Sequence, residues 1–240
     1  MKILGLDSSG LAASVAIVED DKLLAEYTTD YKKTHSQTLL PMLEELRRMI
    51  ELDLDSLDAI AISSGPGSFT GLRIGSATAK GLGFALNKPL VEVPTLEGLA
   101  WNLWGADCLV CPLMDARRNQ VYTAAYEFVA RGEECEMKTV ISQAPMDIGE
   151  LIVRLNGLGR TVTFLGDGVP VYLPVVRQEL RVEYRLAPAG LNRQRAASIA
   201  SLGGVYFRQG RSVDAGVHRP EYLRMSQAEQ DEKQKEACRA

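Results

Sequence analysis

The sequence predicts an α/β protein that consists of two similar lobes, each a mixed sheet covered by helices. Apolar runs with the length of strands alternate with segments of helical periodicity along most of the chain. Three closely spaced strands precede the first helix, which indicates an antiparallel meander at the start of the sheet. The same order of elements recurs in the second half, although the two halves share negligible sequence identity. Two such lobes would enclose a cleft between them.

The first half of the chain has the predicted order β-β-β-α-β-α-β-α. We expect strands at residues 2–9, 13–20, 22–31, 59–63 and 89–94, and helices at 36–51, 70–86 and 95–104. Asp20 and Asp21 supply a tight turn between the second and third strands. The helix at 36–51 is predicted because its leucines recur at helical spacing, and Thr95 is expected to cap the last helix of this half.

The second half repeats this pattern from the strand CLVCPLMDA onward. We expect strands at residues 108–116, 120–129, 135–143, 161–168 and 182–188, and helices at 146–158, 172–180 and 193–210. The boundary between the lobes is predicted near Gly105, which gives an N-terminal lobe at 1–104 and a C-terminal lobe at 105–225. A return of the last helix to the first lobe is left open. Residues 226–240 form a polar tail that is predicted to be disordered.

The composition indicates a soluble protein of the reducing cytoplasm. The 240 residues include 27 Lys and Arg against 31 Asp and Glu, and the net charge of -4 excludes the broad basic surface of a stand-alone nucleic-acid binder. Apolar runs are too short for a signal peptide or a membrane span. Cys108 and Cys111 lie three residues apart in a predicted strand and therefore point to opposite faces. We expect them to be buried thiols rather than a metal or redox pair.

Polar residues at the ends of predicted strands are candidates for a nucleotide cleft. Backbone N–H groups and hydroxyls in the turn after the first strand can hold phosphate, and a carboxylate there can hold magnesium. The alternative is a turn in which Asp and Ser side chains bond to their own backbone. Ligands of such sheets gather at the carboxyl ends of strands, where the second lobe offers matching residues. The candidate cleft residues are Asp7, Ser8, Ser9, Asp115, Gly166 and Asp167.

Metal-dependent or nucleophilic catalysis has little support in the residues. His35 and His218 are the two histidines, and they lie far apart in the sequence. A helical metal pair needs a second ligand four residues after His35, where the chain has Leu39. The G-x-S-x-G pattern of a nucleophilic serine does not occur. We therefore predict no metal site and expect His35 to cap its helix or to order the loop before it.

The segment SGPGSFTGLRIG, residues 64–75, leads into a helix with a stripe of small residues. Its spacing is not that of a Walker phosphate loop. Gly71, Gly75, Ala79 and Gly83 recur every four residues and therefore lie on one helical face. Each glycine costs the helix roughly 1 kcal/mol against alanine, which close packing against another backbone can offset. The stripe fits packing within the lobe and packing across a subunit interface equally well, and anion binding by the loop can coexist with either.

Five segments, spread over nearly all of residues 1–225, carry a resemblance to a known family. They are LGLDSSGLAASVAI, HSQTLLPML, SGPGSFTGLRIGSATAKGLGFAL, FLGDG and PEYLR. The SGPGSFTGLRIG block is highly specific, whereas the others are individually weak. Together they resemble the TsaB family, also called YeaZ. The resemblance implies duplicated actin-like ATPase lobes, similar to ribonuclease H, of the superfamily that includes sugar kinases and Hsp70 ATPases.

The resemblance also implies a function. TsaB proteins take part in making threonylcarbamoyladenosine beside the anticodon of tRNAs that read codons beginning with A. In that pathway TsaD carries the metal and the transfer chemistry, TsaE is an ATPase, and TsaB is the non-catalytic partner of TsaD. The family pairs through helices of the N-terminal lobe, as a homodimer alone or as a heterodimer with TsaD. Contact with tRNA is then expected only through the complex.

Several residue roles follow from the resemblance. TsaD holds its metal through an H-x-x-x-H helix, and the matching positions here are His35 and Leu39, so that one ligand is missing. Arg117 and Arg118 stand where kinase relatives have a glycine-rich phosphate loop, and we expect no cofactor, with weak or no ATP or ADP binding by the chain alone. A sugar-kinase-type phosphotransferase and a metallopeptidase are the alternatives. The implied partner interface comprises Gly71, Gly75, Ala79, Gly83, His35, Leu39 and Leu43.

Overall fold

The computed structural model describes residues 1–31, 35–117, 119–132 and 134–223. One sheet contains β1 (Lys2–Asp7), β2 (Ala13–Glu19), β3 (Lys22–Thr29), β4 (Ala59–Gly65) and β5 (Leu90–Pro94), and the other contains β6 (Leu109–Asp115), β7 (Gln120–Arg131), β8 (Glu134–Asp147), β9 (Val162–Leu165) and β10 (Tyr184–Leu186). The α-helices are α1 (His35–Met49), α2 (Phe69–Leu86), α3 (Thr95–Ala100), α4 (Ile148–Leu158), α5 (Val169–Glu179) and α6 (Ala196–Arg208). None of these helices is both long and apolar enough to cross a membrane. The predicted tail at 226–240 lies outside the described residues.

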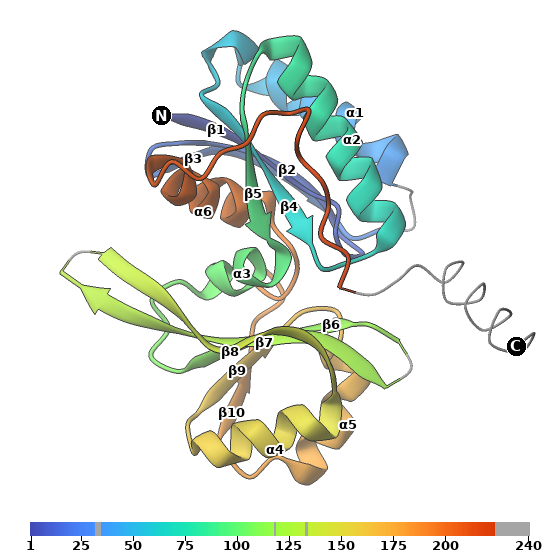
Figure 1. Cartoon of the computed structure of the whole chain (residues 1–240), viewed down its shortest axis with the longest axis vertical. Coiled ribbons are helices and arrows are strands. Elements are labelled where there is room, and N and C mark those ends of the chain that lie inside the picture. The colour runs from blue at the N-terminus through green and yellow to red at the C-terminus, as the bar shows by residue number, and fades with distance from the viewer. Residues whose placement is uncertain (32–34, 118, 133, 224–240) are drawn as a thin grey trace, which may run out of the picture.

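The two sheets have the same topology, which confirms the predicted duplication. The first has the strand order β3-β2-β1-β4-β5, and the second, read from the corresponding edge, has the order β8-β7-β6-β9-β10. Strand β1 is antiparallel to β2 and parallel to β4, and β6 is likewise antiparallel to β7 and parallel to β9. Figure 1 shows the sheets as two lobes, one above the other, with α3 between them. This is the duplicated actin-like fold.

Each sheet buries its apolar residues under its own helices. On one face of the first sheet, Leu4 and Ile62 pack with Leu39 and Leu43 of α1. Helices α4 and α5 cover the second sheet around Phe164. A further cluster joins α3 to β6 and β7 and forms an apolar contact between the lobes. Helix α3 therefore packs against elements of both lobes.

Helix α6 returns to the first lobe, which was the option left open for the last predicted helix. It packs on the face of the first sheet opposite α1 and α2. The approach is close, since a Cβ atom at Gly203 would lie 2.5 Å from the Cβ of Ala61. A Cβ atom at Gly5 would overlap the carbonyl oxygen of Ala196. Glycine at these positions lets the helix lie directly on the strands.

Several predicted boundaries shift for local reasons. Strand β8 runs to Asp147 rather than ending at residue 143, and the Asp147 side chain accepts a hydrogen bond of 2.8 Å from the Gly149 amide as the cap of α4. The β7–β8 ladder changes register between Thr123 and Ala125, so simple alternation does not mark its length. Helix α3 ends at Ala100 and continues as a 3₁₀ turn instead of reaching residue 104.

The cysteine pair behaves as the sequence predicts. Cys108 and Cys111 are both buried and free. Their sulfur atoms lie near different hydroxyl groups, those of Thr163 and Thr123 respectively. Burial raises the pKa of Cys111 to about 12, so its thiol stays protonated and unreactive near neutral pH.

Candidate functional site

The turn after β1 is folded inward and uses most of its polar groups within the chain. Asp7, Ser8 and Ser9 are all at most 1% exposed. The amide and hydroxyl of Ser9 donate hydrogen bonds of 2.8 and 2.6 Å to Oδ1 of Asp7. The hydroxyl of Ser8 donates to the carbonyl of Gly71 at 2.9 Å, and the Ser9 carbonyl accepts from the Ser68 amide at 2.7 Å. The bond from the Ser9 amide to Asp7 is local to the turn, whereas the bonds to Gly71 and Ser68 join the turn to the start of α2.

Burial dominates the electrostatics of Asp7. Desolvation raises the pKa of its carboxyl group above the ordinary value, and the hydrogen bonds from Ser9 oppose this rise only in part. His35 lies close enough to lower the pKa slightly, although its Nε2 atom is engaged with the Gly10 carbonyl at 2.9 Å. The carboxylate therefore has no dedicated cationic partner among the described residues that surround it.

The candidate residues of the second lobe meet at the ends of β6 and β9. Asp115 accepts hydrogen bonds from the Arg117 amide at 2.8 Å and the Tyr172 hydroxyl at 3.2 Å. Burial, together with Asp115, raises the pKa of Tyr172 to about 12. Gly166 has a φ of 109°, and a Cβ atom there would overlap the Leu113 carbonyl, so only glycine fits. Burial also raises the pKa of Asp167. Arg118 lies outside the described residues.

The segment at residues 192–195 connects the two halves of the predicted cleft. The Asn192 carbonyl accepts a 3.0 Å hydrogen bond from the Gly166 amide in the second lobe. Arg193 donates to Asp30 of the first lobe at 3.1 Å. The Gln194 side chain is 1% exposed, would meet a Cβ atom at Gly10, and leaves both amide atoms without a partner in the described part of the chain. The sequence did not indicate this segment, because residues 193–195 were predicted to belong to the helix at 193–210.

His35 and Leu39 play structural roles. His35 is the first residue of α1 and ties that helix to the turn after β1 through the Gly10 carbonyl. Leu39 is 1% exposed and belongs to the core under α1. Within residues 1–31, 35–117, 119–132 and 134–223, acidic, histidine and cysteine side chains form no group of three or more that could hold a metal ion.

The small stripe of α2 packs within its own lobe. A Cβ atom at Gly71 would overlap the Ser8 carbonyl, and one at Gly75 would overlap the Ser8 hydroxyl. Ala79 is fully buried in the core. A Cβ atom at Gly83 would lie 2.8 Å from the Cβ of Ala215. The close backbone approach that the stripe predicts is therefore an approach to Ser8 and Ala215 of the same chain.

Most residues of the predicted partner interface are buried in the lobe by these contacts. Leu39 and Leu43 of α1 are buried in the core as well, so that His35 alone among the seven predicted residues is half-buried. A partner that lies on these helices would instead meet their outward faces. Leu40 is 54% exposed and Phe84 is 63% exposed there. The small exposed residues between the ends of α2 are Ala77, Gly81 and Ala85. The interface itself stays a prediction.

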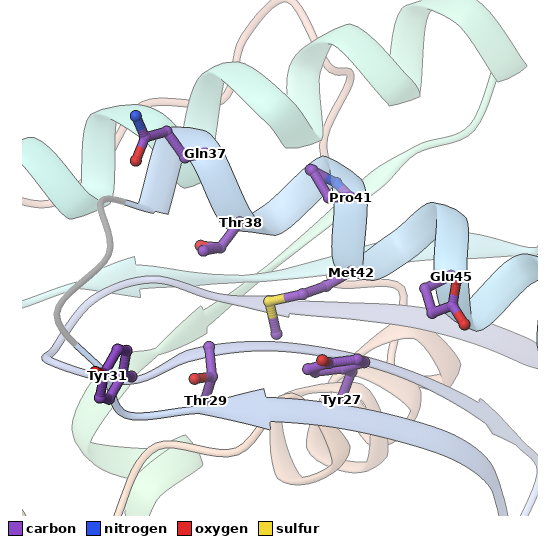
Figure 2. Close-up of a pocket in the computed structure, with 8 residues that line it drawn as sticks. All are labelled: Tyr27, Thr29, Tyr31, Gln37, Thr38, Pro41, Met42 and Glu45. Atoms are coloured by element: carbon purple, nitrogen blue, oxygen red, sulfur yellow. The ribbon is translucent and has the colours of Figure 1, made fainter.

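A cavity of about 300 Å³ lies on the other side of α1, between that helix and β3. Figure 2 shows Met42 pointing from the helix toward the strand, and Tyr27 and Thr29 lying opposite it. The one carboxylate of the lining, Glu45, forms an ion pair with Arg48 at 2.8 Å. The complete lining is Tyr27, Thr29, Tyr31, Gln37, Thr38, Pro41, Met42 and Glu45.

Comparisons with known proteins agree on one family. The family described as TsaD, tRNA N6-adenosine threonylcarbamoyltransferase, matches residues 22–231. The tRNA threonylcarbamoyladenosine biosynthesis protein TsaB of Bacillus subtilis is 31% identical over 229 residues, which cover 95% of this chain and 96% of that protein. The protein of the same name from Haemophilus influenzae is 35% identical and covers 93% and 94%. The solved structure of YeaZ from Pseudomonas aeruginosa has a TM-score of 0.77 at 31% identity, with 92% and 99% coverage.

A pair of alanine substitutions tests the inward packing of α2. Gly71→Ala should lower the free energy of unfolding by about 1–3 kcal/mol, because the new methyl group overlaps the Ser8 backbone. Gly81→Ala should raise it by up to about 1 kcal/mol, since nothing lies within 4 Å of the new methyl group and alanine favours the helix. Urea unfolding followed by circular dichroism measures both. Equal stabilisation by the two changes would contradict the inward packing.

A second prediction concerns Asp7 and pH. The folded-state pKa of Asp7 lies above its ordinary value of 3.8, so ionisation costs stability as pH rises from that value through the folded-state pKa. Asp7→Asn keeps an acceptor oxygen for Ser9 and removes the charge. The stability of Asp7→Asn relative to the unmodified protein should rise over this pH range, by about 1.4 kcal/mol for each tenfold difference between the folded-state and unfolded-state ionisation constants of Asp7. Asp21→Asn, at an exposed residue, is the control. A relative stability of Asp7→Asn that stays constant or falls would refute the desolvated carboxylate.

Proposed function

This chain belongs to the TsaB family and takes part in tRNA threonylcarbamoyladenosine biosynthesis, and we propose that it does so as a non-catalytic subunit that pairs with a TsaD-like protein. In this proposal the TsaD-like partner transfers the threonylcarbamoyl group to the adenosine next to the anticodon. A TsaE-like ATPase completes the complex, and tRNA is bound through the complex. The chain alone forms a homodimer and binds ATP or ADP weakly or not at all.

The observation that supports the proposal is the outward face of α1 and α2, which we define by the exposed residues Leu40, Ala77, Gly81 and Phe84. The two helices lie side by side on one face of the first sheet (Figure 1). Leu40 and Phe84 expose large apolar side chains there. The small residues Ala77 and Gly81 allow another chain to approach the backbone of α2. Exposed large side chains beside small ones allow another pair of helices to pack closely. The same face serves the homodimer and the TsaD-like partner in turn.

The absence of a catalytic role is supported by how the chain uses its own polar groups. The position that would complete a helical metal pair with His35 is the buried Leu39. Ser8 and Ser9 direct their hydroxyl groups to Gly71 and Asp7, which leaves these donors engaged within the lobe. A phosphotransferase would need such donors free to face the phosphate. The proposal therefore assigns the chemistry to the partner.

Charge on the outward face should abolish pairing. In Leu40→Asp a carboxylate would be buried in an apolar contact, which is costly. We expect at least a tenfold loss of affinity for the TsaD-like protein and loss of the homodimer, both measured by analytical ultracentrifugation. Val153→Asp is the matched control, since Val153 is 72% exposed on α4 of the other lobe. Unchanged self-association and unchanged partner binding in Leu40→Asp would rule out this face.

Reconstitution tests the non-catalytic role. The TsaD-like and TsaE-like proteins, tRNA, ATP and threonylcarbamoyl-adenylate should give modified adenosine only when this chain is present. Asp115→Asn, in the exposed candidate cleft residue, should leave the rate within about twofold, which corresponds to well under 1 kcal/mol. Loss of the rate in Asp115→Asn with the complex intact would contradict a non-catalytic role. A titration of the chain with Mg-ATP that gives micromolar affinity would favour the phosphotransferase alternative.

A further inference from the structure

Residues 211–223 form a strap that runs from the end of α6 back along α2. The sequence predicted no element in this region. The strap begins with two backbone hydrogen bonds between Val213 and Leu90, of 2.8 and 2.9 Å, at the start of β5. It ends where the Tyr222 ring lies 4.8 Å from the ring of Phe69, the first residue of α2. Figure 1 shows the strap in red beside α2 for much of the length of the helix.

The middle of the strap holds α2 by side chains of both elements. Ala215 is 4% exposed and packs against Gly83, at the place where a side chain on α2 would collide with it. The Lys80 ammonium group donates hydrogen bonds to the carbonyls of Gly216 and His218, at 3.4 and 3.2 Å. Helix α2 is therefore held at its start, its middle and its last turns by one segment.

The strap itself is anchored to the first sheet and to the loop before α2. His218 is 2% exposed, and its Nδ1 atom lies 2.6 Å from a carboxylate oxygen of Glu92 in β5. The Glu221 amide donates a 2.7 Å hydrogen bond to the Ser64 carbonyl. The Glu221 carbonyl lies so close to Gly65 that a Cβ atom could not be placed there. These contacts hold the strap in place through β5 and the loop before α2. The strap can therefore restrain the helix that packs against it.

We propose that this strap is a brace that sets the position of α2 and thereby the affinity of the outward face for the partner. Ala215 and His218 are positioning residues in this sense: both are buried and act on the partner only through α2. The inference rests on the proposed function, because it takes the outward face of α2 as the partner surface. It also explains why Gly83 and Gly65 are glycines, since each leaves room for the strap.

His218→Ala tests the brace, with hydrogen–deuterium exchange of the chain alone and affinity for the TsaD-like protein as the two measurements. We expect the amides of α2 to exchange at least tenfold faster, those of α4 to stay unchanged, and partner affinity to fall at least fivefold. Val217→Ala is the matched control, because the neighbouring Val217 is 69% exposed on the same strap. It should change neither measurement.

The two measurements separate the brace from the proposed function. Unchanged exchange in α2 would overturn the brace, whatever the partner does. Faster exchange with unchanged affinity would overturn the link to partner binding, and if Leu40→Asp also left the affinity unchanged, the partner surface itself would be wrong. Should His218→Ala accelerate exchange in α4 as well, Lys80→Met provides the second variant. It removes only the two hydrogen bonds to the strap carbonyls, and must still accelerate exchange in α2 for the brace to stand.

Discussion

The contact between the first turns of α2 and the turn after β1 constrains the rest of the first lobe. Gly71 and Gly75 leave no side chain between the helix and Ser8, so the Ser8 backbone can lie directly against the helix. The Ser8 hydroxyl and the Ser9 carbonyl then bond to the helix start. Close packing of this kind excludes water and leaves little freedom for either element. The start of α2 is thereby tied to the central strand of its sheet, whereas the strap contacts the later turns of the helix at Lys80 and Gly83.

The same contact also determines which polar groups of the predicted cleft are engaged in hydrogen bonds within the chain. The Ser8 hydroxyl donates to Gly71 of α2, and the Ser9 amide and hydroxyl donate to Asp7, so these three donors are used within the lobe. In the second lobe Asp115 bonds to its own hairpin and to Tyr172. The segment at 192–195 then touches both strand ends, with Gln194 against Gly10 and Asn192 against Gly166. The two ends of the predicted cleft are thus joined by bonds within the chain.

Helix α2 separates two tasks by its faces. Its inner face carries small residues that pack against the turn after β1 and against the strap. Its outward face carries Phe84, which is 63% exposed and borders Gly216 of the strap, beside the exposed Ala77 and Gly81. A rigidly held helix with an exposed apolar face suits a subunit that binds another protein, because little order has to be gained on binding. This division of the two faces is the one that the proposed pairing with a partner subunit requires.

The sequence by itself determined the two-lobe α/β order, the buried strands and thiols, the missing second metal ligand at Leu39 and the need for close packing along α2. These follow from periodicity, from residue chemistry and from spacing, all of which are local. Only the tertiary structure decided that Ser8 and Ala215 are the backbones that meet the small stripe, and that α6 returns to the first sheet. A stripe of glycines on a helix predicts that another backbone lies close, but not which one. The identity of that neighbour depends on contacts between residues far apart in the chain. The strap has no periodicity at all, and its path is set by those distant contacts alone.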